Sequence, residues 1–318
     1  MSDGSTGTAA ERRPLGRSGL RLSPVGLGTW AWGSRYLWGY GSSYDRGDLE
    51  AAWRASIDAG VNWVDTAEVY GSGESERIIG GLLRGTREEV LVATKFFPLR
   101  LTPWAARRAA ERSLRRLGVG AVDLYQVHWP NPMHPIGATM RAMERLVREG
   151  KVRHVGVSNF GPARLRAAME AMSREEVVSD QVHYNLLQRK PERTGLVELA
   201  RREGVAIIAY SPLAQGVLTD KYGPGMPRPG GMRRFERKFA RGRLECVRPL
   251  VQELRAIGQA QGRTTSQVAL AWLLKDPNVL TIPGAKNGEQ AALNALAART
   301  AVPEEALGRI ERALGECQ

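Results

Sequence analysis

The sequence predicts an α/β fold in which eight parallel strands and their helices close into a single (β/α)8 barrel. Two observations favour this fold. Short apolar runs rich in β-branched residues alternate repeatedly with amphipathic stretches of helical length, which predicts parallel strands joined by crossover helices. Glycines recur between these segments and no Pro- or Ser-rich linker divides the 318 residues, which favours one closed domain over a doubly wound sheet.

Eight runs are expected to form the strands of the barrel. They barely alternate between apolar and polar residues, which is typical of strands that are buried on both faces. In chain order they span residues 25–28, 62–65, 90–95, 122–128, 153–157, 177–182, 205–210 and 279–282.

Helices are expected between these runs, and glycine or proline marks several of their ends. Gly60, Gly118, Gly150 and Gly204 stand where a helix would end, because glycine readily takes the left-handed conformation that follows the last turn. Pro103 stands at a first helical position, where the missing N–H removes no helical hydrogen bond. The expected helices span residues 48–59, 103–118, 137–149, 162–172 and 192–203.

Three segments lie outside the strand–helix repeat. Residues 14–24 contain a Gly-Arg-Ser-Gly turn and are expected to form a β-hairpin that closes the barrel floor. Residues 219–242 are rich in glycine and proline, and a loop of this length is either a functional lid or disordered. We expect residues 1–13 to be a disordered tail without a secretory signal, and residues 14–318 to form the single barrel.

Composition narrows the classes of function. No run of 18 or more apolar residues occurs, so no membrane-spanning helix is predicted. Cys246 and Cys317 suggest neither a disulfide framework nor a zinc site, so the cytoplasm is the expected compartment. The net charge of +13 would suit nucleic acid, but the arginines are interspersed with acidic residues, which is typical of solvated helix faces. We therefore expect a small-molecule partner rather than nucleic acid or a membrane, and the oligomeric state stays undetermined.

Polar and ionisable side chains follow one expected strand after another, at the ends that build the active site of a barrel. These residues are Asp65, Lys95, His128, Ser158, Asn159, Gln181, Tyr210 and Ser211. Taken singly, each has an ordinary structural interpretation: an aspartate can cap a turn, a lysine can extend to solvent, and a histidine can hydrogen-bond within its loop. The convergence of Asp65, Lys95 and His128 with Tyr70 on one rim favours a catalytic site instead.

The residues Asp65, Tyr70, Lys95 and His128 form a coherent set for reducing a carbonyl group by hydride transfer. Negative charge develops on the carbonyl oxygen, and a tyrosine hydroxyl can donate the proton that this oxygen takes up. A neighbouring ammonium group lowers the tyrosine pKa, and a carboxylate keeps that ammonium group charged. A histidine can hydrogen-bond the substrate oxygen and orient it. This chemistry requires no metal.

These residues and their neighbours resemble the motifs of the aldo-keto reductase superfamily. The matching residues are 28–30, 65–67, 70–71, 95, 128–130, 156–160, 210–213 and 282–286, in family order and at family spacings from about residue 15 to residue 298. The opening at residues 28–41 is similar to a branch that contains pyridoxal-reductase-like and plastid enzymes. The resemblance implies Tyr70 as the general acid, Lys95 and Asp65 as the pair that tunes it, and His128 as the residue that orients the substrate.

The resemblance also implies a nicotinamide cofactor. Lys286 can pair with a 2′-phosphate, so we expect NADPH, with NADH as the alternative. Lys286 stands where arginine is frequent in the family, and Leu293 stands where many members carry an acidic residue. The implied cofactor-binding residues are Gly28, Thr29, Trp30, Asp65, Ser158, Asn159, Gln181, Tyr210, Ser211, Pro212, Leu213, Gln215, Gly216, Pro283, Gly284, Ala285, Lys286, Gln290 and Asn294.

Aromatic residues are expected to line the substrate pocket beside the catalytic residues, and aromatic walls suit small aromatic, heterocyclic or sugar-like carbonyl compounds. The expected pocket residues are Trp30, Trp32, Tyr36, Trp38, Tyr70, His128 and Trp129, although several of these aromatics could instead pack the first long loop. Two other functions stay open. The same barrel could serve as a cofactor-binding regulatory subunit with little turnover, or its positive charge could bind nucleic acid.

Overall fold

The computed structural model describes residues 10–98, 103–131, 133–222, 226, 229 and 231–315. Within them, eight parallel strands form one sheet in the order β10-β9-β8-β7-β6-β5-β4-β3. The strands are β3 (Leu27–Gly28), β4 (Trp63–Asp65), β5 (Leu91–Phe96), β6 (Val122–Val127), β7 (Val152–Ser158), β8 (Val177–His183), β9 (Ala206–Tyr210) and β10 (Val279–Ile282). The predicted barrel with eight strands is confirmed.

The first and last strands of the sheet meet, and this contact closes the barrel. Parallel bridges join Val25 to Thr281 and Gly28 to Gly284. The approach is close at Gly28, where an added Cβ would lie 2.5 Å from the carbonyl oxygen of Ile282. Only a residue without a side chain fits there at no steric cost.

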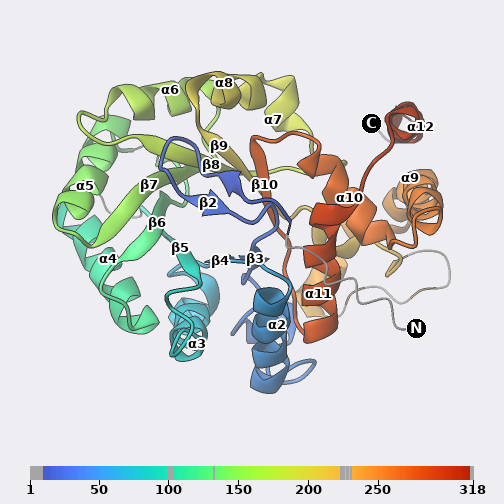
Figure 1. Ribbon diagram of the computed structural model, residues 1–318, viewed down its shortest axis with the longest axis horizontal. Helices are drawn as coiled ribbons and strands as arrows, with labels where there is room; N and C mark the ends of the chain where they lie inside the picture. The colour runs from blue at the N-terminus through green and yellow to red at the C-terminus, as the bar shows by residue number, and fades with distance from the viewer. Residues whose placement is uncertain are drawn as a thin grey trace, which may run out of the picture.

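Helices surround the strands as an outer ring (Figure 1). They are α1 (Arg35–Trp38), α2 (Arg46–Asp58), α3 (Glu74–Leu82), α4 (Pro103–Leu117), α5 (Ile136–Arg148), α6 (Pro162–Glu170), α7 (Lys190–Arg193), α8 (Leu196–Glu203), α9 (Arg241–Gln259), α10 (Thr265–Leu274), α11 (Gly288–Leu296) and α12 (Glu304–Gly315). The helix expected over residues 192–203 is wrong in one respect, because α7 and α8 are separate. Gly195 has φ +71°, a left-handed conformation that interrupts the helix.

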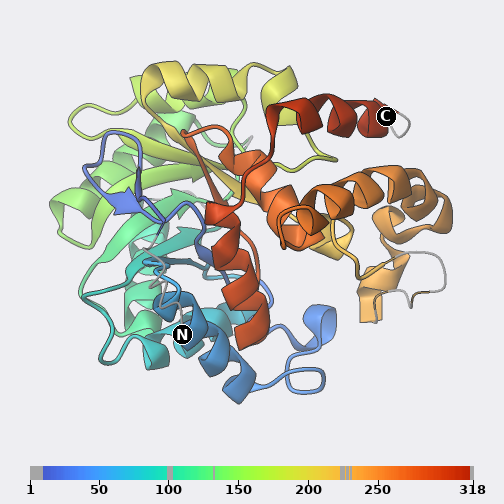
Figure 2. The same ribbon diagram turned by 45° about the vertical axis from the view of Figure 1, so that its right-hand side comes forward.

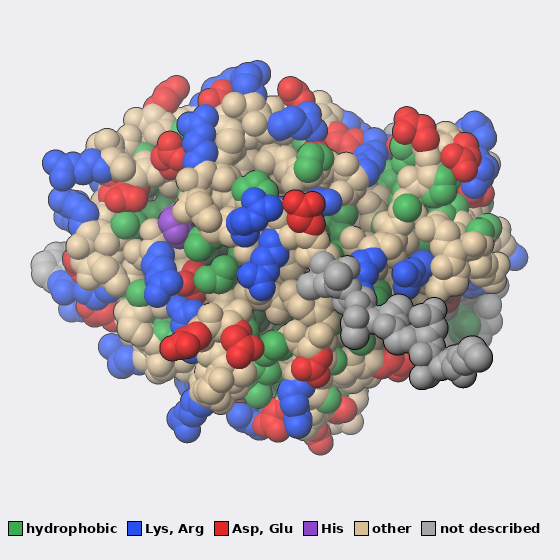
Figure 3. All heavy atoms as spheres, viewed as in Figure 1, with side chains coloured by type: hydrophobic (Ala, Val, Ile, Leu, Met, Phe, Trp, Pro, Cys, Tyr) green, Lys and Arg blue, Asp and Glu red, His purple; other side chains and the backbone are tan. Residues whose placement is uncertain are grey.

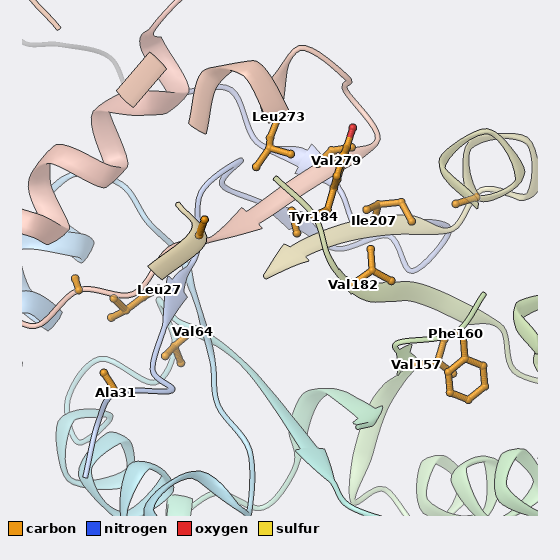
Figure 4. Packing of buried hydrophobic residues seen from close by; sticks show 14 of the residues in the cluster. Leu27, Ala31, Val64, Val157, Phe160, Val182, Tyr184, Ile207, Leu273 and Val279 are labelled. Atoms are coloured by element: carbon orange, nitrogen blue, oxygen red, sulfur yellow. The ribbon is translucent and has the colours of Figure 1, made fainter. Parts of the chain in front are cut away.

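Two apolar layers hold the barrel together. The outer layer lies between the strands and the helices, and Figure 4 shows Val182, Ile207 and Val279 of this layer on three neighbouring strands. The inner layer fills the barrel and includes Trp63 and Leu124. Full burial of such side chains contributes roughly 1.5–3 kcal/mol each, so the two layers supply most of the stabilising free energy.

The predicted N-terminal hairpin is confirmed and caps the inner layer. Strands β1 (Arg13–Pro14) and β2 (Arg21–Leu22) pair antiparallel, and Figure 1 shows β2 across the end of the barrel. Leu15 and Leu22 pack with the barrel interior. Arg13, which we placed at the end of the tail, lies in β1 and donates hydrogen bonds to three carbonyl oxygens near β10. Residues 1–9 of the expected tail lie outside the described residues.

The segment at residues 219–242 packs on the barrel through part of its described residues, whereas others, such as Met226 and Phe235, are exposed. It contains two short 3₁₀ helices, η3 (Gly231–Phe235) and η4 (Arg237–Phe239), and Phe239 is fully buried. The segment leads into α9, which projects from the ring (Figure 2). Of the two alternatives, these contacts favour a covering segment over a disordered one.

Three further observations concern membrane spans, surface charge and the cysteines. None of the described helices is long and apolar enough to cross a membrane. Figure 3 shows basic and acidic side chains interspersed over the face seen in Figure 1. Cys317 lies outside the described residues, so the expectation drawn from the two cysteines stays a prediction.

Candidate active site

A buried ion pair lies inside the barrel at the carboxyl ends of β4 and β5. The Nζ of Lys95 donates to Oδ1 of Asp65 at 2.5 Å, and the two side chains are 0% and 2% exposed. Lys95 also donates to the carbonyl oxygen of Thr66 at 2.9 Å and to the hydroxyl of Tyr70 at 3.3 Å. The three N–H groups of the ammonium therefore all have acceptors.

The second carboxylate oxygen of Asp65 is held as firmly as the first. Oδ2 accepts from the Nε2 of Gln126 at 3.1 Å and from the Nε2 of Gln181 at 2.8 Å. A buried charge is costly unless it is paired and hydrogen-bonded, and both conditions are met here. Burial alone lowers the pKa of Lys95, but the charges and hydrogen bonds of Asp65 and Tyr70 outweigh it and raise that pKa. Lys95 is therefore an ammonium group at neutral pH.

Tyr70 places its hydroxyl over this ion pair from the short helix η1 (Tyr70–Gly73). The Lys95 Nζ lies 5.0 Å from the centre of the Tyr70 ring. We expected the ammonium to lower the tyrosine pKa, but the net pKa of Tyr70 is raised, because burial outweighs the opposing charge of Lys95. The physical reason is that a phenolate would be poorly solvated here. At neutral pH Tyr70 therefore carries the proton that a general acid must donate.

His128 follows β6 and completes the predicted group of four residues. Its ring meets that of Tyr70 edge to face, with 5.8 Å between the ring centres. Burial, followed by the charge of Lys95, lowers the pKa of His128 to about 3, so the imidazole is neutral. Its buried Nδ1 has no hydrogen-bond partner among the described residues. His128 is not among the described residues that line the main cavity, but a buried polar atom without a partner suits the binding of a polar ligand atom.

Residues with a left-handed backbone conformation lie in the loops at the carboxyl ends of the strands, around the same site. Five non-glycine residues of the described chain have positive φ, and they are Ser72, Asn159, Ser211, Ala214 and Gln215. They lie in the loop that follows Tyr70, after β7 and after β9. Such conformations cost about 1–3 kcal/mol each and cluster at binding sites. The sequence contains no glycine signal for these positions, so only the structure reveals them.

Asn159, Ser158 and Tyr210 form a hydrogen-bonded group beside the ion pair. The hydroxyl of Tyr210 donates to Oδ1 of Asn159 at 2.9 Å, and the amide of Asn159 donates to the hydroxyl of Ser158 at 3.0 Å. Ser158 and Gln181 are almost completely buried, so they lie beneath the rim rather than on it. None of Ser158, Asn159 and Gln181 is among the described residues that line the main cavity, whereas Tyr210 is.

A cavity of about 330 Å³ opens at the carboxyl ends of the strands and extends from Tyr70 toward α11. Most of the residues implied as cofactor-binding line it. They are Gly28, Thr29, Trp30, Asp65, Tyr210, Ser211, Pro212, Leu213, Gln215, Gly216, Pro283, Gly284, Lys286, Gln290 and Asn294, and Leu293 joins them. Ala285 differs: its side chain is buried and its carbonyl oxygen accepts from Nε1 of Trp32 at 2.9 Å.

Three cations gather at the far end of this cavity, and two of them were not predicted from the sequence. Lys221 and Arg233 come from residues 219–242 and line the cavity together with Lys286. Arg233 stacks at 4.2 Å on the ring of Trp38 and donates to the carbonyl oxygen of Gln215 at 2.8 Å. The only sequence signal was the basic composition of that segment, which does not say which cation turns toward the cavity.

Burial and the neighbouring cations depress the pKa of the third cation. Burial, then the charges of Arg233 and Lys221, lower the pKa of Lys286 to about 8. Its Nζ donates to the carbonyl oxygen of Trp38 at 3.0 Å, and no carboxylate of the described chain forms an ion pair with it. Positive charges held together without a counter-charge repel one another, so an anion bound there would be stabilised.

The expected aromatic pocket needs correction. Trp32 is fully buried and packs in the core, and Tyr36 is 93% exposed, so neither lines the cavity. Trp38 does line it, but beside the cation cluster rather than beside Tyr70. Trp30 lines the cavity and is 39% exposed, whereas Trp129 is 45% exposed and is not among the described residues that line it. The conformation of the loop sets these positions. Trp32 points inward because its Nε1 donates to the carbonyl oxygen of Ala285, after β10.

Several known proteins are similar to this chain in sequence and in fold. Residues 24–314 match the profile of the Aldo/keto reductase family. An uncharacterized oxidoreductase of Mycobacterium tuberculosis is 43% identical over 87% of this chain and 85% of its own length. The chloroplastic pyridoxal reductase of Arabidopsis thaliana is 35% identical over 84% of this chain and 76% of its own length.

Solved structures agree with these sequence relatives. An aldo-keto reductase of Klebsiella pneumoniae, crystallised in complex with NADPH, superposes with a TM-score of 0.78 at 31% identity. That similarity covers 95% of this chain and 94% of the other. The closed barrel and the match along almost the whole sequence lead to one conclusion: the chain belongs to the aldo/keto reductase family.

Proposed function

We propose that the protein reduces an aldehyde or ketone with NADPH, and that Tyr70 is the general acid. The observation that carries this proposal is the chain of contacts from Asp65 through Lys95 to the Tyr70 hydroxyl, at 2.5 Å and 3.3 Å, beside the cavity. A protonated tyrosine held over a buried ammonium group suits proton donation to a developing alkoxide.

The residues of the cavity fit the proposed cofactor. Lys286, Arg233 and Lys221 offer uncompensated positive charge for phosphate groups, and Lys286 would hold the 2′-phosphate that distinguishes NADPH from NADH. Tyr210 lines the cavity together with Tyr70, and the strained loop at Ser211–Gly216 would cover the pyrophosphate. The NADPH complex of the Klebsiella relative supports the same choice. When bound, NADPH supplies the hydride.

Each catalytic side chain then has one task. The neutral His128 ring hydrogen-bonds the carbonyl oxygen of the substrate and holds it near Tyr70. The Tyr70 hydroxyl donates its proton to that oxygen as negative charge develops there. Lys95 stabilises the phenolate that remains, and Asp65 keeps Lys95 charged and in position. Trp30 in the cavity wall suits substrates with a flat ring, and one relative is a pyridoxal reductase.

The test is NADPH consumption by the purified protein across an aryl aldehyde, pyridoxal, a dicarbonyl and a keto-sugar, with NADH in parallel. Carbonyl-dependent consumption is expected, and Tyr70→Phe should reduce kcat by about 10²- to 10⁴-fold. Fluorescence titration of the variant with NADPH should show that binding persists. Full turnover in Tyr70→Phe would refute the acid role. Tight NADPH binding by the wild type with no turnover on the panel would favour a regulatory subunit instead.

A further inference from the structure

A second, separate pocket lies on the outside of the barrel between α3 and α4, and it is shallow and wide open to solvent. Four arginine side chains line it, and its volume is about 350 Å³. Arg77 comes from α3, and Arg112, Arg115 and Arg116 come from the last two turns of α4. None of these residues lines the main cavity.

The charge around this pocket is not balanced. Glu74 pairs with Arg77, Glu68 with Arg112 and Glu76 with Arg116. Arg115 is exposed and forms no ion pair with any residue that the structure describes. Four guanidinium groups therefore face three carboxylates, which leaves one positive charge in excess.

The carboxylates do not neutralise the open side of the pocket. Glu76 is fully buried and turns its other oxygen inward to the hydroxyl of Thr94, at 2.7 Å. Glu68 accepts from the backbone N–H of Phe97 at 2.9 Å. Arg77, Arg112 and Arg116 each use one nitrogen in these ion pairs, so most guanidinium N–H groups of the cluster have no carboxylate partner among the described residues.

Placement at a helix end explains only part of the cluster. Arg115 and Arg116 lie in the last turn of α4, where cations interact favourably with the helix dipole. That effect does not account for Arg77, which belongs to the first turns of a different helix, or for the hollow that the four side chains share. Several forked guanidinium groups around one hollow are the arrangement that binds phosphate in bidentate fashion.

Two ion pairs connect this pocket to the catalytic residues. Arg112 holds Glu68 at 3.1 Å, two residues before Tyr70, and Arg116 holds Glu76 at 2.6 Å, in the helix that follows the Tyr70 loop. Arg116 also lies against Gly73, where an added Cβ would be 2.8 Å from its side chain.

The second of these ion pairs also reaches the strand of the catalytic lysine. Glu76 accepts from Thr94, and Thr94 is the neighbour of Lys95 in β5. The outward-facing contacts of α4 therefore brace both sides of the Tyr70–Lys95 contact.

We propose that the four-arginine pocket binds a phosphate group, either inorganic phosphate or the phosphate of a small metabolite, and that occupancy lowers turnover. The bound anion competes with Glu68 and Glu76 for Arg112 and Arg116, and this loosens the segment that carries Tyr70. The effect on turnover rests on the proposed function, whereas binding of the anion does not.

Binding is measured first, by isothermal titration of the full chain with inorganic phosphate at constant ionic strength. Saturating NADPH is present, so that the cations of the main cavity do not contribute. The variant Arg77→Ala/Arg115→Ala removes half of the pocket without breaking the two bracing ion pairs, and it should lose phosphate binding. The control Arg164→Ala/Arg166→Ala removes the same charge from exposed positions of α6 and should keep it. Equal binding by both variants would overturn the site.

A second titration is independent of the proposed cofactor. In Lys286→Met/Arg233→Met the main cavity has lost two cations, yet phosphate binding at the arginine pocket should persist. If binding disappears in this variant but survives in Arg77→Ala/Arg115→Ala, the phosphate binds the main cavity and the proposal is wrong.

Turnover is measured last, at saturating NADPH and carbonyl. Phosphate should lower wild-type kcat about fivefold, the lower end of ordinary coupling between sites, with no effect on the Arg77→Ala/Arg115→Ala variant. Metabolites that carry a phosphate ester act at lower concentration than inorganic phosphate if they are the natural ligand. An unchanged kcat in an enzyme that turns over and binds phosphate would overturn the coupling, and an enzyme without turnover would point to failure of the proposed function instead.

Discussion

Replacing Asp65 with asparagine removes the counter-charge of Lys95 while keeping the size of the side chain. Lys95 is 0% exposed, so its ammonium group would be left buried without a carboxylate. Asparagine also offers one acceptor oxygen in place of two, although Lys95 and the amides of Gln126 and Gln181 all donate to this position. At least one buried donor therefore loses its partner.

The expected cost follows from these contacts. Breaking a buried ion pair by removing one partner destabilises a protein by about 3–5 kcal/mol. For a large domain each kcal/mol lowers Tm by roughly 2–4 °C, so Tm of Asp65→Asn should fall by at least about 6 °C. The control is Glu50→Gln, which breaks the exposed Arg46–Glu50 pair and should cost only about 0–1 kcal/mol.

The assay is thermal and urea unfolding of both variants, combined with the double variant Asp65→Asn/Lys95→Met. Methionine keeps most of the lysine stem but carries no charge, so the double variant should be more stable than Asp65→Asn alone. A double variant as unstable as the single one would mean that lost packing, rather than an unpaired charge, causes the effect. An Asp65→Asn variant as stable as the Glu50→Gln control would refute the reasoning altogether.

Three further predictions concern titration and packing. The pKa of His128 falls from its ordinary 6.5 to about 3, so the unfolded chain binds more protons between these values. The stability that the neutral ring contributes is then complete above pH 6.5 and is lost as pH falls toward 3, and NMR titration should find this ring neutral at about pH 5. Because the pKa of Lys286 is lowered to about 8, the Kd of NADPH, measured by fluorescence, should rise about tenfold above that pH, while the Kd of NADH and that of Lys286→Met should not follow. Gly28→Ala should cost about 1–3 kcal/mol in urea unfolding, because its Cβ would lie 2.5 Å from the carbonyl oxygen of Ile282; unchanged stability would mean that the barrel seam adjusts freely.

Local patterns were sufficient for most of the fold. Each of the eight strands was predicted because a buried parallel strand leaves a continuous apolar run that is visible without neighbours. The helix over residues 192–203 was predicted as one piece, because its apolar spacing continues through Gly195 and only the backbone there shows the break.

Asp65, Tyr70, Lys95 and His128 were recognisable because each follows a strand or lies in a motif, and strand ends in a barrel converge by geometry alone. The tertiary structure decided how deeply each of these side chains is buried, which spacing along the chain does not show. Burial set the direction of the Tyr70 pKa, opposite to the one expected from the charge of Lys95 alone. Desolvation depends on every atom around a group, and those atoms come from the whole chain.

Contacts between distant segments also explain why several side chains lie elsewhere than the sequence predicted. Trp32 and Trp38 are close in sequence, yet Trp32 is buried in the core whereas Trp38 packs against Arg233. Arg233 follows Trp38 by more than 190 positions in the chain. The arginine pocket likewise joins two helices whose separate patterns indicate only solvated faces. The sequence by itself determined the elements, their order and the chemistry of the rim. Contacts between distant segments determined which side chains are dry, which are charged and which share a cavity, because desolvation and Coulomb energy depend on distance in space rather than along the chain.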